Sequence, residues 1–113
     1  MHEVGIMEGA LETAQNLMQT RRGSRLMHLH MTVGTLSGVV PEALHSAFLV
    51  LKDSYAAKDA SLDIRTVEAL CQCDTCRKPF PFTDNGYLCP KCGEPALAVL
   101  CGRELELTRI EWE

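Results

Sequence analysis

The chain has 113 residues, and its 11 basic and 15 acidic side chains give a formal net charge of −4. At this length it forms one small domain or one and a half, which argues against a multidomain enzyme that encloses its substrate. The 46% apolar and 23% charged residues exclude a disordered or fibrous chain. The acidic balance, with no basic stripe, argues against binding to nucleic acid.

The first part of the chain alternates between helical and extended patterns. Apolar residues recur at spacings of three and four from Val4 to Met18, which predicts an amphipathic helix. From residue 27 to 33 apolar and polar residues alternate, which predicts a strand with one buried face. His28 and His30 then lie on its polar face.

A second helix and two more strands follow. Pro41 suits the first position of a helix that is expected to reach about Tyr55. Alternation predicts a strand over residues 62–66 and a last strand over 105–112. The apolar positions of the last strand change parity, so either a bulge near Arg109 shifts its register or both of its faces are covered.

This order of elements predicts an α+β fold in which two helices pack on a three-stranded sheet. Three strands and two helices can share one core only if the last strand returns to the first part of the chain. We therefore expect residues 1–70 plus 103–113 to form one α/β domain. Residues 71–102 are expected to form an inserted, zinc-ribbon-like module with four cysteine ligands.

The cysteines are the unusual feature of the composition. All six fall within 31 consecutive positions, at Cys71, Cys73, Cys76, Cys89, Cys92 and Cys101. Such local clustering is typical of a metal site and not of the disulfide framework of a secreted domain. The acidic start does not match a signal peptide, and the sequence contains no 18-residue apolar run. We therefore expect a reducing, cytoplasmic compartment and no membrane partner.

Four of the cysteines form two Cys-x-x-Cys knuckles, Cys73/Cys76 and Cys89/Cys92, separated by twelve residues. Each knuckle aims two sulfurs at one point, and two knuckles complete a tetrahedral four-sulfur shell that suits a structural zinc(II) ion. The turn sequence Asp84-Asn85-Gly86 between them predicts a hairpin that returns the second knuckle to the first. Disulfides or redox-active dithiols are the alternatives.

Two cysteines remain outside this set. Cys71 precedes the first knuckle by one residue, and we interpret it as a packed thiol, with ligand exchange or redox chemistry as alternatives. Cys101 is expected to be a small buried residue at the exit of the module.

The first three residues have coordination potential of another kind. The amine of Met1, the deprotonated amide of His2 and the His2 imidazole would close a five-membered and a six-membered chelate ring in one plane, a geometry of nickel or copper. Glu3 could add a donor or hold a neighbouring group. The alternative is a plain helix start with a polar second residue.

The other histidines are less specific. His28 and His30 can bind a metal as a pair, although a solvated or helix-covered strand face is the simpler interpretation. His45 is expected at the boundary of the apolar face of the second helix.

Three motifs together are similar to one known family. Met-His-Glu at residues 1–3, the segment VGTLSGVVPEAL at residues 33–44 and the two knuckles resemble the HypA/HybF family of hydrogenase maturation proteins, in the family's order and over essentially the whole chain. One departure is Thr35, which stands where the family commonly has an acidic residue. We expect that change to alter a surface contact and not nickel binding.

The resemblance implies a nickel metallochaperone that acts with the GTPase HypB on the large subunit of NiFe hydrogenase, and in some bacteria also serves urease maturation. By position, it implies transient nickel(II) at Met1, His2 and Glu3. It likewise implies structural zinc(II) at Cys73, Cys76, Cys89 and Cys92. The alternatives are a zinc-ribbon adaptor that binds proteins without transferring nickel, and a thiol oxidoreductase. Since no nucleophile–base pair, phosphate loop or carboxylate pair is evident, we expect no enzymatic activity.

Overall fold

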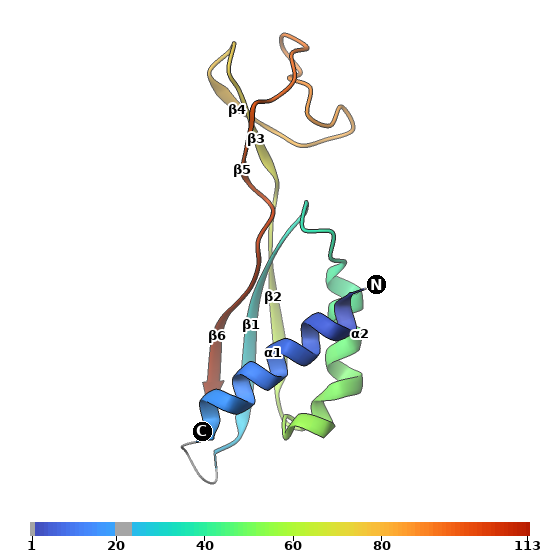
Figure 1. Cartoon of the computed structure of the whole chain (residues 1–113), viewed down its shortest axis with the longest axis vertical. Coiled ribbons are helices and arrows are strands. Elements are labelled where there is room, and N and C mark those ends of the chain that lie inside the picture. Colours follow the sequence, from blue (N-terminus) through green and yellow to red (C-terminus); the bar gives the residue numbers. More distant parts are fainter. Residues whose placement is uncertain (1, 20–23) are drawn as a thin grey trace.

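The protein is elongated, with principal extents of 58 × 24 × 16 Å in a computed structural model that describes residues 2–19 and 24–113. Both helices and one sheet occupy one end, and the cysteine-containing loops occupy the other (Figure 1). Among the described residues, no helix is long and apolar enough to cross a membrane.

The two expected helices are present as α1 (Glu3–Met18) and α2 (Pro41–Leu51). The second helix was expected to reach Tyr55, but its last turn tightens into the 3-10 helix η1 (Lys52–Tyr55). This segment ends at Ala56, which adopts a left-handed conformation with φ 56°. A tighter last turn and a left-handed residue together give the final carbonyl groups hydrogen-bond partners that a regular helix end leaves unpaired.

The first sheet has the strand order β2-β1-β6. Its central strand β1 (Leu26–Gly34) pairs in parallel with β2 (Ser61–Val67) and antiparallel with β6 (Leu105–Trp112). The last strand therefore returns to the first part of the chain, as expected. The side chains that fill the core between this sheet and the helices are Met7, Ala10, Leu11, Ala14, Leu26, Leu29, Met31, Val33, Leu44, Ala47, Phe48, Ala57, Ala60 and Leu62.

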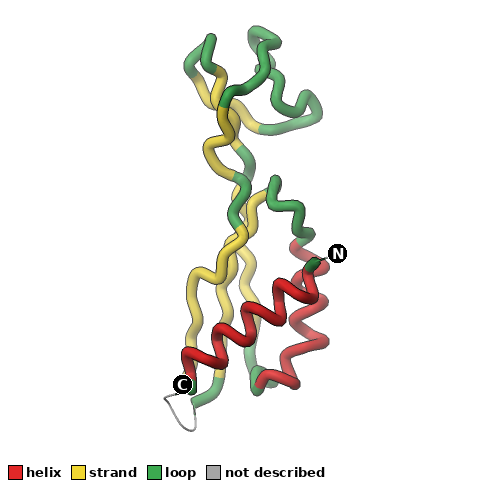
Figure 2. Tube along the Cα trace, in the orientation of Figure 1, coloured by secondary structure: helices red, strands yellow, loops and turns green. Residues whose placement is uncertain are grey.

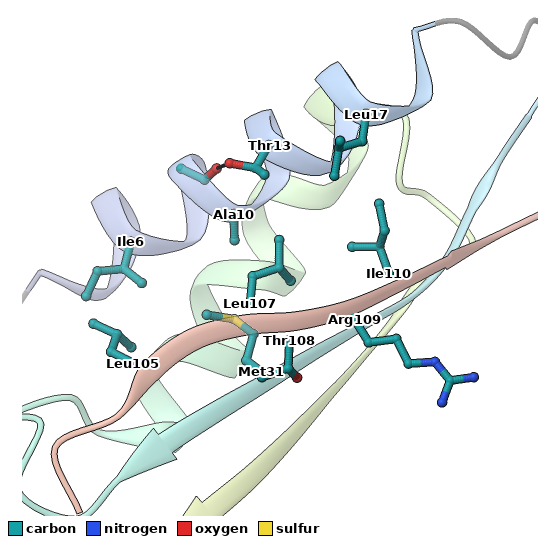
Figure 3. A pocket seen from close by; sticks show the side chains of 11 residues that line it. Ile6, Ala10, Thr13, Leu17, Met31, Leu105, Leu107, Thr108, Arg109 and Ile110 are labelled. Carbon is teal, nitrogen blue, oxygen red and sulfur yellow. Dashed lines mark hydrogen bonds between the residues drawn. The ribbon is translucent and has the colours of Figure 1, made fainter.

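The parity change in the last strand comes from a bulge at Thr108, the first of the two alternatives. His30 pairs with Arg109, but the next residue, Met31, pairs with Leu107, so β6 carries one extra residue. The shift lets Leu107 and Ile110 both pack against the core despite their odd spacing. Figure 3 shows these two side chains on the side of α1, while Arg109 points away from the helix.

A second three-stranded sheet carries the cysteines. It has the order β4-β3-β5, with β3 (Leu70–Cys73), β4 (Lys78–Pro81) and β5 (Ala98–Cys101). Figure 2 shows that the chain enters this sheet directly from the first one and leaves it directly toward β6. The α+β fold with an inserted cysteine module is thus confirmed, while the boundaries at residues 71 and 102 stay a prediction.

The two sheets meet at a narrow neck formed by residues 34–36, 67–69 and 102–104. The backbone packs closely here: a Cβ atom added to Gly34 would lie 2.0 Å from the carbonyl oxygen of Gly102. The Leu36 N–H donates a hydrogen bond to that same oxygen at 2.6 Å. Thr35 also belongs to the neck, because its Oγ1 accepts a hydrogen bond from the Ala69 N–H at 2.9 Å. Its side chain therefore connects two segments of the chain itself.

Candidate metal centres

The structure brings the two Cys-x-x-Cys knuckles together. The ligand atoms of Cys73, Cys76, Cys89 and Cys92 all lie within 4.8 Å of one another. Two of these separations are 3.5 Å, between the Cys73 and Cys92 sulfurs, and 4.0 Å, between the Cys89 and Cys76 sulfurs. Sulfurs of a tetrahedral zinc site with bonds of about 2.3 Å lie about 3.8 Å apart, so the four side chains fit a zinc ion.

Local backbone geometry places each knuckle. In the first, the Cys76 N–H lies 3.3 Å from the Cys73 sulfur and donates to it. In the second, the Gly93 N–H donates to the Cys89 carbonyl at 2.9 Å, and Gly93 adopts the expected left-handed conformation with φ 76°. The residue at the same place after the first knuckle, Arg77, is also left-handed, with φ 57°. This left-handed conformation at Arg77 was not predictable from the sequence, since arginine rarely adopts it.

The electrostatics of the cluster favour a cation. The N–H groups of Cys92 and Lys91 lower the pKa of the Cys89 thiol to about 7. The neighbouring thiols of Cys92 and Cys73 raise the pKa of Cys76 to about 12, because a second anionic sulfur is unfavourable beside them. Four thiolates can therefore coexist here only around a positive ion, which would occupy the centre of the cluster.

The remaining two cysteines have different surroundings. Cys71 is fully buried beside Cys73, Phe80 and Cys89, which agrees with its interpretation as a packed thiol. Cys101 was expected to be buried, but it is partly exposed. Its thiol lies 3.4 Å from the Glu68 carbonyl oxygen, to which it donates, because β5 ends here at the neck.

The second candidate metal site is at the amino terminus. Met1 lies outside the described residues, whereas His2 and Glu3 are described. His2 is the exposed N-cap of α1, and its carbonyl accepts the first helical hydrogen bond, from the Ile6 N–H at 2.9 Å. Glu3 differs, since it is only 5% exposed and its Oε2 accepts a hydrogen bond from the Val40 N–H at 3.1 Å. Its carboxylate thus connects the start of α1 to the N-cap of α2.

The charge of Glu3 is strongly favoured. The positive amino terminus, two residues away along the chain, and the Val40 N–H lower the pKa of Glu3 to about 2. An apolar groove of about 500 Å³ lies next to this carboxylate between the two helices, and its lining includes Val4, Ala43 and Val50. A second groove, of about 510 Å³, runs between α1 and β6 (Figure 3).

The histidine pair on β1 has partners that the sequence did not indicate. The rings of His28 and His30 stack with their centroids 5.7 Å apart. The Nε2 atom of His30 lies 2.6 Å from Glu111 Oε1, and its Nδ1 lies 3.6 Å from Asp63 Oδ2. Both acidic residues come from neighbouring strands, so only the strand register could have revealed them. His45 is exposed on α2, 6.4 Å from the Phe48 ring, as a boundary residue should be.

Comparison with known proteins gives consistent results. A family model described as "Hydrogenase/urease nickel incorporation, metallochaperone, hypA" matches residues 1–112. The hydrogenase maturation factor HypA of a Picosynechococcus species is 38% identical over 111 residues, which cover 98% of each chain. That of a Roseiflexus species is 33% identical over 100% of this chain and 93% of its own.

Two solved structures share the fold. The solution structure of the Ni metallochaperone HypA from Helicobacter pylori matches with a TM-score of 0.62 and 23% identity, over 98% of this chain and 97% of that one. A second solution structure, of a HypA protein, matches with a TM-score of 0.68 and 22% identity, over 98% and 95% of the two chains. At this level of identity these two comparisons support the fold alone.

Two helices on a three-stranded sheet, with a four-cysteine centre inserted before the last strand, define a small protein with one candidate metal centre among its described residues. The whole-chain family match and the relatives make the assignment specific. The chain belongs to the HypA family, the nickel metallochaperones of hydrogenase maturation. The four-cysteine cluster is consistent with a structural zinc site.

Proposed function

We propose that this protein carries one nickel(II) ion on its first residues and releases it during assembly of the NiFe hydrogenase large subunit. The ligands are the Met1 amine, the His2 amide nitrogen and the His2 imidazole. The observation that carries this proposal is the position of His2, which is exposed at the N-cap of α1. Nickel is the cargo and not a resident cofactor.

The place of His2 explains how such a site could form without damage to the fold. The amide groups at the start of a helix have no acceptor within the helix, so the His2 amide can lose its proton to a metal without breaking a helical hydrogen bond. The exposed imidazole leaves the metal open to incoming ligands. A site built this way releases its metal by ligand exchange with a partner, as a carrier must.

Glu3 is best suited to position this site. Because its Oε2 accepts the Val40 N–H, its carboxylate is turned toward α2 and fixes the first turn of α1. We therefore assign Glu3 the role of holding His2 in place, with metal ligation as the less favoured role.

The zinc ion is assigned a structural role. Cys73, Cys76, Cys89 and Cys92 would hold it, and the ion supplies the positive charge that lets four thiolates lie together. Four sulfur ligands leave no open coordination position for a substrate. We accordingly assign no enzymatic activity to this centre.

Membership of the family supports a proposal for the partners and the location. Hydrogenase maturation factors act with other maturation proteins, and we assign to this chain a HypB-type GTPase and the hydrogenase large subunit, with urease maturation proteins as further candidates. The cytoplasm is the compartment in which reduced cysteines persist. Neither nucleic acid nor a membrane is assigned as a partner.

Nickel titration of the zinc-loaded protein tests the ligand set. His2→Gln removes the imidazole but keeps a second residue too large for removal of Met1, and we expect it to lower nickel affinity at least about tenfold, which corresponds to about 1.4 kcal/mol. A two-residue extension at the N-terminus should do the same, since it separates the amine from His2. A single added residue is unsuitable, because His2 would become the third residue and could form a new chelate of amine, amides and imidazole. His45→Gln is the matched control and should bind normally. Unchanged affinity in both the His2 variant and the extended protein would overturn the proposal.

A complementation assay separates this function from that of a zinc-ribbon adaptor. In cells that lack the native maturation factor, His2→Gln should fail to restore nickel to the hydrogenase while still binding its partners. An adaptor without nickel transfer would restore hydrogenase equally with either sequence. His45→Gln again serves as the control.

A further inference from the structure

We propose that His28, His30 and Glu111 form a second, exchangeable site for a divalent late transition metal on the open face of the first sheet. These residues lie on the side of the sheet opposite the core, because they alternate with Leu29, Met31 and Ile110, which pack beneath the helices. All three side chains are accessible, with exposed fractions of 43% for His28, 29% for His30 and 40% for Glu111.

The strand register brings these donors together. Residue 28 pairs with residue 111 across the β1–β6 ladder, and His30 follows two positions later on the same face. The extra residue at Thr108 belongs to this arrangement, since without it β6 would present its other face beside the histidines. The fold thus places one carboxylate between two imidazoles.

One oxygen of Glu111 lies near a ring nitrogen of each histidine. Glu111 Oε1 lies 2.6 Å from His30 Nε2 and 4.0 Å from His28 Nδ1. Two ligands of one ion, with bonds of about 2.0–2.2 Å, lie about 2.9–3.4 Å apart. The first distance must lengthen by about 0.3–0.8 Å and the second shorten by about 0.6–1.1 Å. The two rings, whose centroids are 5.7 Å apart, must also turn their nitrogens toward a common point, which rotation of exposed side chains can supply.

The donor set selects the class of metal. Imidazole nitrogens favour nickel, copper and zinc, while a site of hard cations would consist of oxygens alone. Three protein ligands leave positions for water, so the ion would be exchangeable. Asp63 lies 3.6 Å from the other ring nitrogen of His30 and can orient that ring, as carboxylates commonly do behind a histidine ligand.

Neighbouring charges limit the affinity. Arg109 Nη2 lies 3.3 Å from Glu111 Oε2, so part of the carboxylate charge is already compensated. A hollow of about 400 Å³ beside His30 and Asp63 is also lined by Arg65. We therefore expect a site that binds nickel more weakly than the amino-terminal one.

This site is separate from the two described above. His28 lies near the start of β1, whereas Glu3 contacts Val40, which follows the end of that strand. The four cysteines lie beyond the neck, in the other sheet (Figure 1). The inference does not depend on whether the first residues carry nickel.

Nickel(II) sulfate titrated into the full-length, zinc-loaded His2→Gln protein tests the proposal. We expect one remaining equivalent of nickel to bind, and His28→Gln or Glu111→Gln in this background to weaken that binding at least about tenfold. His45→Gln is the control and should leave it unchanged. In NMR spectra, six-coordinate nickel is paramagnetic and should broaden the ring signals of His28 and His30 before those of His45.

His28→Gln is the decisive variant, because His28 lies too far from Glu111 for a hydrogen bond and its loss should not alter the melting temperature. Loss of nickel binding at an unchanged melting temperature supports the site. Nickel binding that persists in the His28→Gln/His30→Gln double variant, or broadening that reaches His45 first, would overturn it.

Discussion

The carboxylate of Glu3 is fixed against the start of the second helix, where its Oε2 accepts the Val40 N–H at 3.1 Å. Because Val40 is the N-cap of α2 and Glu3 the first residue of α1, this one hydrogen bond joins the beginnings of both helices. The side chain is 5% exposed, so water cannot easily replace it. The position of His2 thus depends on the contact of its neighbour Glu3 with a residue 37 positions further along the chain than Glu3.

Substitution of Glu3 separates positioning from ligation. Glu3→Ala leaves the Val40 N–H without its acceptor, so we expect a melting temperature several degrees lower and nickel affinity about tenfold weaker. Glu3→Gln keeps a carbonyl oxygen for the Val40 N–H, and its nickel affinity should stay within about threefold of the native protein. Thermal denaturation and nickel titration measure both effects. If Glu3→Gln keeps its stability but binds nickel as poorly as Glu3→Ala, the carboxylate is itself a ligand.

Because the neck is closely packed, we expect one added methyl group there to lower the stability of the protein strongly. Gly34→Ala would place a Cβ 2.0 Å from the Gly102 oxygen, so the neck must separate and lose the Leu36 hydrogen bond. We expect a loss of about 2–4 kcal/mol in the free energy of unfolding.

The matched control is Gly9→Ala in α1, where an added Cβ has no heavy atom within 4 Å. That change should stabilise the protein by about 0.5–1 kcal/mol, since alanine favours a helix over glycine. Chemical denaturation of both variants measures the difference. Equal stability of the two proteins would mean that the neck is not closely packed.

The elements that could be predicted correctly from the sequence are those that a local pattern of residues indicates. The periodicity of α1, the alternation in β1 and the spacing of the two knuckles each depend on neighbouring residues. The parity change in β6 left two alternatives, and the structure shows the bulge. The tightened end of α2 was missed, because it ends at a left-handed alanine, Ala56, and no sequence signal marks that conformation.

Contacts between distant segments were not predictable in the same way. Thr35 was expected to affect a surface contact, and it is exposed, but the sequence did not indicate that its Oγ1 also accepts the Ala69 N–H across the neck. Nothing in the sequence pattern singled out Glu111, although it lies beside His30, 81 positions away. Register brings such pairs together, and a single sequence does not reveal register.

The raised pKa of Tyr55 predicts a loss of folding stability at high pH. Partial burial raises the pKa of Tyr55 above 10, helped by the negative charges of Glu12 and Glu8 and by the hydrogen bond of its hydroxyl to Glu12 at 3.4 Å. Because the pKa is higher in the folded than in the unfolded protein, this contribution to stability is complete below pH 10 and is lost as the pH rises through the folded pKa.

Ultraviolet titration of tyrosinate measures this effect. Tyr55→Phe should remove the part of the absorbance change that occurs at the highest pH, and Glu12→Gln should move that part to lower pH. Glu106→Gln, on β6, removes a carboxylate of the same type elsewhere and should change nothing. A titration curve of Tyr55 that is the same with and without Glu12 would contradict the assigned cause.

Loss of one cysteine should distinguish the metal ligands from the other thiols. Cys73→Ala removes one sulfur of the cluster, and we expect the protein to lose its zinc on dialysis, since the remaining thiols lie too close together without a cation. Cys101→Ala, whose thiol only donates to the Glu68 carbonyl, should keep one zinc per chain. Zinc content measured after dialysis gives the comparison.

The same variants test whether zinc holds the module together. Phe82 and Tyr87 meet edge to face with centroids 4.9 Å apart, in the loop between the two knuckles. Zinc loss in Cys73→Ala should abolish NMR contacts between these rings. The NMR signals of α1 and α2 should persist, because these helices share a hydrophobic core with the first sheet and not with the cysteine module. Chelation of zinc from the native protein should reproduce that result. The binding free energy of structural zinc that is then lost is about 10–16 kcal/mol. If the rings keep their contact without metal, the module folds on its own and zinc has another role.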